Sequence, residues 1–431
     1  MNKGKFIHQV QTIKSVDDLV KILNSLRIKK YGEQSSPITK NLLFYLASNN
    51  TPISDLYTFN FIPKKAGGTR KIQVSCKKLK EIQKYIVEVL SVLYSPESYV
   101  TGFVRGKNII ENARPHVGHK YLVTWDIKDF FNSVHAKLIK VSLTKEPFNF
   151  SDDVANLITN ICSVRISEDS NKRVLPQGAP SSPILSNIIF AEADKIISDI
   201  CEKGRGIKCS WRGWPGGVTY TRYADDMTFS ANWDFYHDHR FSWGEIKRDF
   251  RYAFRENLHL RPFYYLVDLQ LSEIKTRRCK DGQRKVVTGI VVNEKLNVKR
   301  EFVREIRDIL YIWEKYGYDA AKKRYLIHNK KNLIIKRTNS ELLNILVGKI
   351  NFIKQVKGAD DAIFNKFKTR LVQLCARQKK PQLVIVILST GMKLRGELID
   401  LDLDKGITIS IAGLTRIIPI NIIKEIIQDD L

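Results

Sequence analysis

Two adjacent carboxylates, Asp225 and Asp226, stand between two short β-prone stretches in the segment Tyr220–Ser230. Like charges side by side repel, and each raises the pKa of the other, so a chain keeps such a pair mainly where a cation neutralises it. The flanking stretches predict a hairpin with both carboxylates at its tip. Oxygen ligands of this kind suit Mg²⁺. The alternative is a solvated turn, because turns favour Asp.

Asp126 offers a third carboxylate about a hundred residues upstream. It ends the apolar run Tyr121–Asp126, which predicts a buried strand that carries the carboxylate at its C-terminal end. If this strand faces the hairpin, the three carboxylates could hold two metal ions about 4 Å apart, as in sites that activate a hydroxyl and stabilise a leaving pyrophosphate. Asp129 is expected past the strand end, in a surface or capping role.

The segment Leu175–Asn187 begins with turn-forming residues and becomes apolar and helical in its second half. Gly178 permits a close approach of the backbone, and Ser181 or Ser182 could cap the helix that begins near Pro183. The sequence therefore predicts a loop that could pack against a nucleotide and a template. An ordinary loop with a helix cap would have the same composition.

The order of these segments resembles palm motifs A, B and C of reverse transcriptases: Asp126, then LPQGAPSSP, then YADD. Upstream, Ile62–Ile72 is similar to the basic hairpin of the fingers. In that family the hairpin holds the incoming triphosphate, which implies this role for Lys65 and Arg70. A Gly-Gly turn with flanking cations suits a mobile phosphate clamp. A solvated basic hairpin is the alternative.

Two more segments resemble retron reverse transcriptases, bacterial enzymes that copy part of their own structured noncoding RNA. Residues 112–116 read NAxxH, and residues 287–289 read VTG. The resemblance implies RNA-binding roles for Asn112, His116, Val287, Thr288 and Gly289. A surface or capping pair and an ordinary strand-turn string are the alternatives. Group II intron, abortive-infection and other defence-associated reverse transcriptases are the competing relatives.

The resemblance also implies a preference for deoxynucleotides. The family's bulky residue five positions after the motif A aspartate closes over the 2′ position of the sugar, and here it is Phe131. An RNA-dependent RNA polymerase would more often place polar groups there. The alternative is a core aromatic, because Phe130 and Phe131 are adjacent and one would point inward in a strand.

Four further residues take roles from the same resemblance. Gln177 would contact the incoming nucleotide, and Tyr223 would pack near the primer end. Lys275 falls where the family's motif D supplies a lysine that protonates pyrophosphate, although most lysines are simply solvated. The backbone carbonyl of Ile127 would complete the metal ligands.

The charge balance fits a polyanionic partner. The chain has 72 basic and 45 acidic residues, a net charge of +27, which implies salt-dependent binding to nucleic acid. Its 17 Tyr, 20 Phe and 6 Trp add surfaces on which bases can stack, although most aromatics will lie in the core.

Other classes are disfavoured. The six cysteines are scattered without a CxxC pair, so neither a disulfide framework nor a zinc site is expected. The first residues lack the apolar core of a signal peptide, and no apolar run approaches the length that spans a bilayer. We therefore expect no membrane contact and a location in the reduced cytoplasm.

These landmarks predict an α+β right-hand polymerase in five regions. They are a helical N-terminal region (1–55), fingers (56–118), palm (119–297), a helical thumb (298–378) and a small β-domain (379–431). Lys299 and Arg300 precede an amphipathic segment whose basic side could follow the template-primer backbone. From Leu383 onwards, short alternating strands with glycine turns resemble an Sm-like or SH3-like barrel, although a plain β-appendage would read similarly.

The predicted reaction is RNA-templated DNA synthesis from dNTPs with two Mg²⁺ ions, in which Asp126, Asp225 and Asp226 are the ligands. Resemblance to retrons further implies a cognate noncoding RNA as template and primer, and priming from an internal 2′-hydroxyl. It also implies a branched RNA-DNA product (msDNA) and antiphage defence through a separate effector protein. A different defence or intron polymerase, or a noncatalytic RNA-binding scaffold, is the alternative. The oligomeric state stays open.

Overall fold

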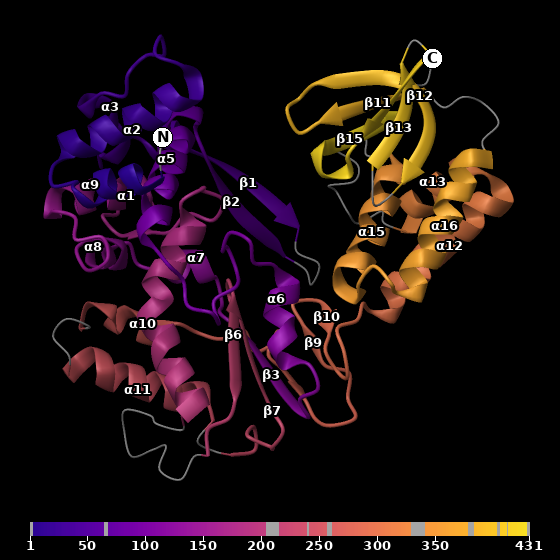
Figure 1. Cartoon of the computed structure of the whole chain (residues 1–431). Coiled ribbons are helices and arrows are strands. Elements are labelled where there is room, and N and C mark those ends of the chain that lie inside the picture. The colour runs from indigo at the N-terminus through magenta and orange to yellow at the C-terminus, as the bar shows by residue number, and fades with distance from the viewer. Residues whose placement is uncertain are drawn as a thin grey trace. The chain divides into compact units, whose positions relative to one another are not determined.

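The chain folds as two compact units, Met1–Thr288 and Gly289–Leu431 (Figure 1). The computed structural model describes residues 3–63, 68–203, 215–238, 241–256, 261–328, 341–377, 383–402, 406–411 and 413–428. Helices and antiparallel sheets occur in both units, which confirms the expected α+β class. The boundaries of the fingers, palm, thumb and β-domain within these units stay predictions.

The first unit begins with helices that pack by apolar stripes. Ser15 caps the second helix in a capping box with Asp18, and Leu19 and Leu23 on the same helix are buried. The four helices are α1 (Lys3–Gln11), α2 (Val16–Tyr31), α3 (Lys40–Ala47) and α4 (Ile53–Leu56). An antiparallel pair follows, β1 (Tyr57–Pro63) and β2 (Thr69–Ser75), with Ile62 opposite Arg70. Lys65 lies outside the described residues.

A four-stranded sheet in the order β6-β7-β3-β8 forms the centre of this unit. Its strands are β3 (Tyr121–Asp126), β6 (Thr219–Tyr223), β7 (Asp226–Ala231) and β8 (Arg277–Cys279). Trp125 on β3 and Phe229 on β7 pack with ring centroids 4.7 Å apart. Because β3 and β7 are antiparallel and in register, the last residue of one strand, Asp126, lies opposite the first residue of the other, Asp226.

Helices and short strands surround this sheet. Asp194 on one of them, α10, contacts Tyr220 and Arg222 of β6. The helices are α5 (Lys77–Leu93), α6 (Ile109–Ala113), η1 (Arg114–His116), α7 (Phe130–Ser133), α8 (Lys137–Leu143), α9 (Asp152–Ile161), α10 (Ser182–Lys203), α11 (Trp243–Glu256) and η3 (Arg261–Asp268). The short strands are β4 (Val164–Arg165), β5 (Arg173–Val174) and β9 (Val286–Val287).

The second unit combines helices with a five-stranded antiparallel sheet. After β10 (Ile290–Val291) come α12 (Arg300–Tyr316), α13 (Tyr318–His328), α15 (Leu342–Lys357) and α16 (Ala362–Arg377). The sheet contains β11 (Leu383–Leu388), β12 (Lys393–Asp402), β13 (Gly406–Ile411), β14 (Leu414–Ile418) and β15 (Ile423–Gln428), with η4 (Ile420–Ile422) before the last strand. Its order is β14-β13-β12-β11-β15, so the fifth strand returns to pair with the first.

The α12 helix is amphipathic, as its sequence indicates. Ile306, Ile309 and Trp313 are buried on one side, whereas Arg304 and Arg307 are exposed. Lys299 is the N-cap residue of this helix and Arg300 is its first residue. Their proposed contact with a nucleic-acid backbone stays a prediction.

The NAxxH and VTG segments meet in the interior of the first unit. His116 contacts both β6 and β7, with Nε2 2.8 Å from Oγ1 of Thr221 and Nδ1 2.6 Å from Oγ of Ser230. Asn112 accepts a 2.7 Å hydrogen bond from Thr101 and donates one of 3.4 Å to Thr288.

These contacts bear on the predicted RNA-binding roles. Asn112, His116 and Val287 are completely buried, and an RNA contact by these residues stays a prediction. The hydrogen bonds of Asn112 and His116 join residues 112–116 to Thr288 and to the sheet. Thr288 is half-buried and bonded to Ile109 as well as Asn112, and an RNA contact by Thr288 or Gly289 stays a prediction.

The buried imidazole makes stability pH-dependent. Burial, with a smaller effect of His119, lowers the pKa of His116 from 6.5 to about 3. As pH falls below 6.5, His116 becomes protonated in the unfolded chain but stays neutral in the folded chain. The free energy of unfolding therefore decreases. Between pH 6 and 5 this site should cost roughly 1 kcal/mol of unfolding free energy. Other histidines with lowered pKa values, such as His119, contribute in both proteins. Urea titrations should therefore show a loss that is larger by roughly 1 kcal/mol in the wild type than in His116→Gln; parallel pH profiles would contradict this.

The turn between β6 and β7 is held by a hydrogen bond from a buried arginine. Ala224 has a φ of 58°, and its carbonyl accepts a 3.0 Å hydrogen bond from Nη1 of Arg222. Arg222 forms a two-pronged ion pair with Asp194 on α10, and both side chains are fully buried. Gly102 packs against the turn, and its carbonyl accepts a 2.8 Å bond from Asn187.

Gly102 leaves no room for a side chain. A Cβ there would overlap the backbone nitrogen of Ala224 and stand 2.8 Å from the carbonyl carbon of Tyr223. Gly102→Ala should therefore lower the free energy of unfolding by about 1–3 kcal/mol, the usual cost of overpacking. Gly244→Ala is the control, because the nearest atom to a Cβ at Gly244 is 3.7 Å away. Chemical denaturation of both variants tests this, and equal stabilities would argue against the tight contact.

Candidate active site

Three carboxylates converge at one end of the central sheet. Asp126 ends β3 and pairs with Asp226 at the start of β7, and Asp225 precedes it in the turn. The backbone N–H of Ile127 donates a 3.1 Å hydrogen bond to the carbonyl of Asp225, which holds the strand end against the turn. Asp126 is only 5% exposed, and the other two carboxylates are half-buried.

This arrangement concentrates negative charge in a poorly hydrated place. Burial, followed by the charges of Asp225 and Asp126, raises the pKa of Asp226 to about 7. Burial also raises the pKa of Asp225, followed by the effect of Asp126, whereas Lys275 and Arg70 act in the opposite direction. Burial and mutual repulsion therefore both oppose the ionised forms of Asp225 and Asp226.

Lys275 supplies part of that positive charge. Its Nζ lies 2.8 Å from Oδ2 of Asp126, and the backbone N–H of Ser272 donates a 2.8 Å bond to the Asp126 carbonyl. The Lys275 side chain is 54% exposed, so it can reach solvent as well as the carboxylate. A lysine held here could deliver a proton to a leaving group, although the general-acid role stays a prediction.

The donor chemistry of these residues fits a hard divalent cation. Within the part of the chain that the structure describes, no group of three or more His, Cys, Asp or Glu side chains is already arranged around a metal position. Instead, the ammonium of Lys275 is paired with Oδ2 of Asp126. Asp126, Asp225 and Asp226 offer carboxylate oxygens, which Mg²⁺ prefers, and a cation would favour the ionised forms of Asp225 and Asp226.

The loop that carries Gln177 is fixed to β2. The N–H of Gln177 donates to Oε1 of Gln73, and its carbonyl accepts from the N–H of Gln73, both at 2.7 Å. Gly178 has a φ of 125°, and a Cβ there would stand 2.8 Å from Ile72. Glycine is thus required by both conformation and space. The Ser182 hydroxyl donates to the Pro176 carbonyl and does not act as the expected helix cap.

The remaining predicted residues are distributed around these carboxylates. Phe131 lies in α7 rather than in a strand, half-buried between the rings of Phe130 and Phe103, with centroids 5.1 and 6.0 Å away. Tyr223 ends β6 opposite Asp226. Arg70 is exposed on β2 and close enough to Asp225 to lower its pKa. The structure leaves their contacts with a nucleotide or primer as predictions.

Sequence reasoning missed the supports of this site. Arg222 and Asp194 lie 28 positions apart, and a charged residue in a short strand is usually expected at a surface. Gln73, which holds the Gln177 loop, belongs to no sequence motif that would have indicated this contact. The available signal for Arg222 was its position in a β-prone run of threonines and tyrosines, three residues before the first of the paired aspartates.

Residues 62–241 match the family model described as "Reverse transcriptase (RNA-dependent DNA polymerase)". The chain is 35% identical to the retron Ec83 reverse transcriptase of Escherichia coli over 172 residues, 40% of this chain and 51% of that protein. It is 28% identical to the E. coli retron Ec86 reverse transcriptase, over 66% of this chain and 77% of the relative. The retron Mx65 reverse transcriptase of Myxococcus xanthus is 27% identical over 58% and 54%.

The matches thus span between about half and three quarters of these relatives' lengths. Among solved structures, telomerase from Candida albicans in complex with a telomeric RNA fragment aligns at a TM-score of 0.37 and 10% identity, over 81% of this chain and 65% of that one. That likeness is too low to support an argument. In the described residues, the helices are too short or too polar to cross a membrane. Residues 62–241 of the first unit therefore match a reverse transcriptase domain, and the chain is similar to retron reverse transcriptases over part of its length.

Proposed function

We propose that this protein is the RNA-directed DNA polymerase of a retron, which uses dNTPs to copy a cognate structured noncoding RNA in the cytoplasm. The observation that carries the proposal is the convergence of Asp126, Asp225 and Asp226 at the sheet end, inside a segment of reverse transcriptase sequence. Buried carboxylates with raised pKa values and few counter-charges need a cation, and polymerase chemistry supplies one.

Each residue of the site has a part in this reaction. The three aspartates would hold two Mg²⁺ ions, which when bound would activate the primer hydroxyl and stabilise the leaving pyrophosphate. The Gln177 loop, fixed on β2 through Gln73, would position the incoming nucleotide together with Arg70. Lys275 would leave its ion pair with Asp126 and donate a proton to the leaving group from Nζ.

Resemblance to retrons supplies the finer part of the proposal. The noncoding RNA would be both template and primer, the first bond would form at an internal 2′-hydroxyl, and the product would be a branched msDNA. Antiphage defence would require a separate effector protein. The curated relatives are named retron reverse transcriptases, which supports a retron over a group II intron or another defence system.

Removing any one carboxylate should abolish synthesis. Asp126→Asn, Asp225→Asn and Asp226→Asn should each reduce dNMP incorporation on poly(rA)·oligo(dT) at least about a hundredfold, because preorganised electrostatic contacts are worth that much in a transition state. Asp129→Asn is the matched control, since Asp129 is exposed and lies three residues past Asp126. Steady-state incorporation in Mg²⁺ measures the effect. Full function of an Asp225→Asn/Asp226→Asn protein would instead favour a noncatalytic scaffold.

Sugar selection should depend on the ring of Phe131. Phe131→Val should raise the rNTP-to-dNTP ratio of kcat/KM by about ten- to a hundredfold, because a smaller side chain no longer excludes the 2′-hydroxyl. Phe131→Tyr, which keeps the ring, should stay near the wild-type ratio. Single-nucleotide incorporation with matched rNTP and dNTP pairs measures the ratio. An unchanged ratio in the valine variant would assign Phe131 to packing alone.

The retron assignment is tested by the nucleic acid that copurifies with the protein. We expect one structured RNA joined to DNA, and debranching enzyme should release the RNA from the DNA. Efficient synthesis on unrelated primers without a branched species would favour a different reverse transcriptase. Bound RNA that yields no DNA when dNTPs and Mg²⁺ are supplied would refute the polymerase.

A further inference from the structure

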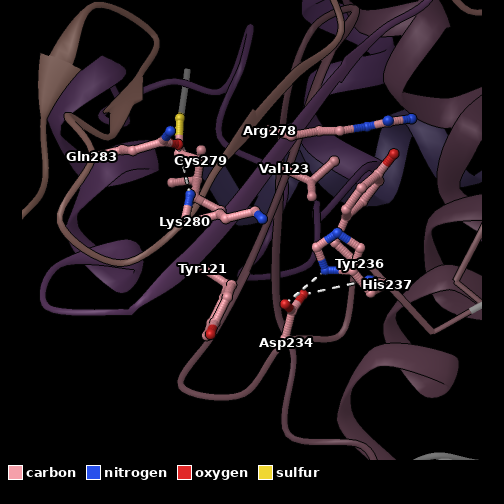
Figure 2. Close-up of a pocket in the computed structure, with 10 residues that line it drawn as sticks. Tyr121, Val123, Asp234, Tyr236, His237, Arg278, Cys279, Lys280 and Gln283 are labelled. Atoms are coloured by element: carbon pink, nitrogen blue, oxygen red, sulfur yellow. Dashed lines mark hydrogen bonds and ion pairs between the residues drawn. The ribbon is translucent and has the colours of Figure 1, made fainter.

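A small cavity lies on the central sheet, away from the carboxylates. Its volume is about 160 Å³, and it lies where β3 begins beside the edge strand β8 (Figure 2). Tyr121, the first residue of β3, lines it, whereas Asp126 ends the same strand. Five residues of extended chain separate the two by roughly 17 Å. The cavity is therefore not part of the site described above.

The floor and walls of the cavity come from one face of the sheet and a nearby loop. Tyr121 and Val123 alternate onto the same face of β3, and Val123 is paired with Arg278 of β8. Tyr236 comes from the loop that follows β7, and the Arg278 guanidinium carbon lies 3.9 Å from the centre of its ring. Figure 2 shows the tyrosines and Arg278 around the hollow. Aromatic rings and a guanidinium plane are the groups on which nucleobases stack.

The size of the cavity restricts what can enter it. Pockets for drug-sized ligands have volumes of roughly 300–1,000 Å³. A cavity of about 160 Å³ takes one planar ring system and leaves the sugar and phosphate of a nucleotide outside. A second hollow of about 750 Å³ is also lined by Tyr236 and Arg278. The two hollows are therefore adjacent, and a strand bound in the first could continue into the second.

The surroundings of the cavity are positively charged. The segment Thr276–Lys285 contains five cations and one acid, and four of the cations are exposed: Arg277, Arg278, Lys280 and Arg284. Lys280 lines the cavity directly. Asp234, the acid among the lining residues that the structure describes, is bonded to His237 at 2.7 Å. Cations beside a stacking surface are the combination that binds single-stranded nucleic acid.

We propose that this cavity binds one unpaired base of a single-stranded RNA segment, stacked against Tyr121 and Tyr236, with adjacent phosphates on Arg278 and Lys280. The proposal rests on the proposed function in that RNA is the partner. It adds an RNA-binding site on the central sheet. This site is separate from the carboxylates at which template and primer would meet.

His237 favours RNA over DNA at this position. Its Nδ1 lies 2.7 Å from Oδ2 of Asp234, and an imidazole that donates there has an acceptor at Nε2 when it is neutral. A ribose 2′-hydroxyl can donate to such an acceptor, and deoxyribose cannot. His237 is 57% exposed at its side chain, so a strand at the mouth of the cavity can reach it.

The test uses the full chain and a 12-nucleotide oligo(rU) with a 5′ fluorophore, with one central 4-thiouridine for crosslinking. Tyr121→Ala and Arg278→Ala should each weaken binding about 5- to 100-fold in fluorescence anisotropy, the range for loss of one stacked base. Tyr121→Phe keeps the ring and should bind like the wild type. Lys84→Ala, which removes an exposed cation from α5, is the control for charge alone. Crosslinks should map to β3, β8 or the Asp234–His237 loop.

Extension of poly(rA)·oligo(dT) by the same variants separates this proposal from the proposed function. Unchanged extension together with weakened oligo(rU) binding supports a separate RNA site. Failure of the wild type to incorporate dNMP both on poly(rA)·oligo(dT) and on its copurified RNA refutes the polymerase but leaves the binding comparison intact. Wild-type affinity in Tyr121→Ala and Arg278→Ala, or crosslinks confined to other elements, would overturn the RNA site and leave the cavity to a partner protein's side chain. Equal affinity for oligo(dT) would overturn the selection of ribose.

Discussion

Mutual repulsion of three aspartates is the constraint on which the rest of the first unit depends. Asp126 and Asp226 are opposite each other in the sheet, and Asp225 is next in the chain. A shift of one residue between β3 and β7 would turn the Asp126 side chain to the other face and separate the charges. The sheet nevertheless keeps this register. The apolar contacts that hold it, including that between Trp125 and Phe229, must outweigh the electrostatic cost at the strand ends.

The first unit contains two ion pairs that differ in burial and in function: Arg222 with Asp194, and Lys275 with Asp126. Arg222 and Asp194 are fully buried and bind each other through two parallel bonds, so neither is available to a ligand. Their contribution is geometric, because Arg222 also holds the carbonyl of Ala224. Lys275 and Asp126 form a single contact, and the lysine is half-exposed. That pair can open when a cation or a substrate replaces the ammonium, whereas the buried pair cannot open without exposing unpaired charge.

The sequence predicted those parts of the molecule that depend on residue type and order. The hairpin with Asp225 and Asp226, the strand that ends at Asp126 and the amphipathic α12 helix follow from periodicity and turn composition. The family resemblance then indicated which carboxylates meet. The motif that contains Asn112 and His116 shows their spacing but not their burial. Their hydrogen bonds to Thr101, Thr221 and Ser230 depend on tertiary contacts that one sequence does not reveal. The same holds for the Arg222–Asp194 pair and the cavity beside β8.

The bond between Asn112 and Thr288 spans 176 residues and joins two segments of the first unit that lie far apart in the chain. A ribosome adds about 5–20 residues per second, so roughly ten to thirty seconds separate the emergence of these two residues. During that interval β3 is available, but its partners β7 and β8 are still being synthesised. The four-stranded sheet, in which β3 lies between β7 and β8, can therefore be completed only late in the synthesis of the first unit. The hydrogen bond between Asn112 and Thr288 forms later still, so the segment before β3 stays without this partner during most of that time.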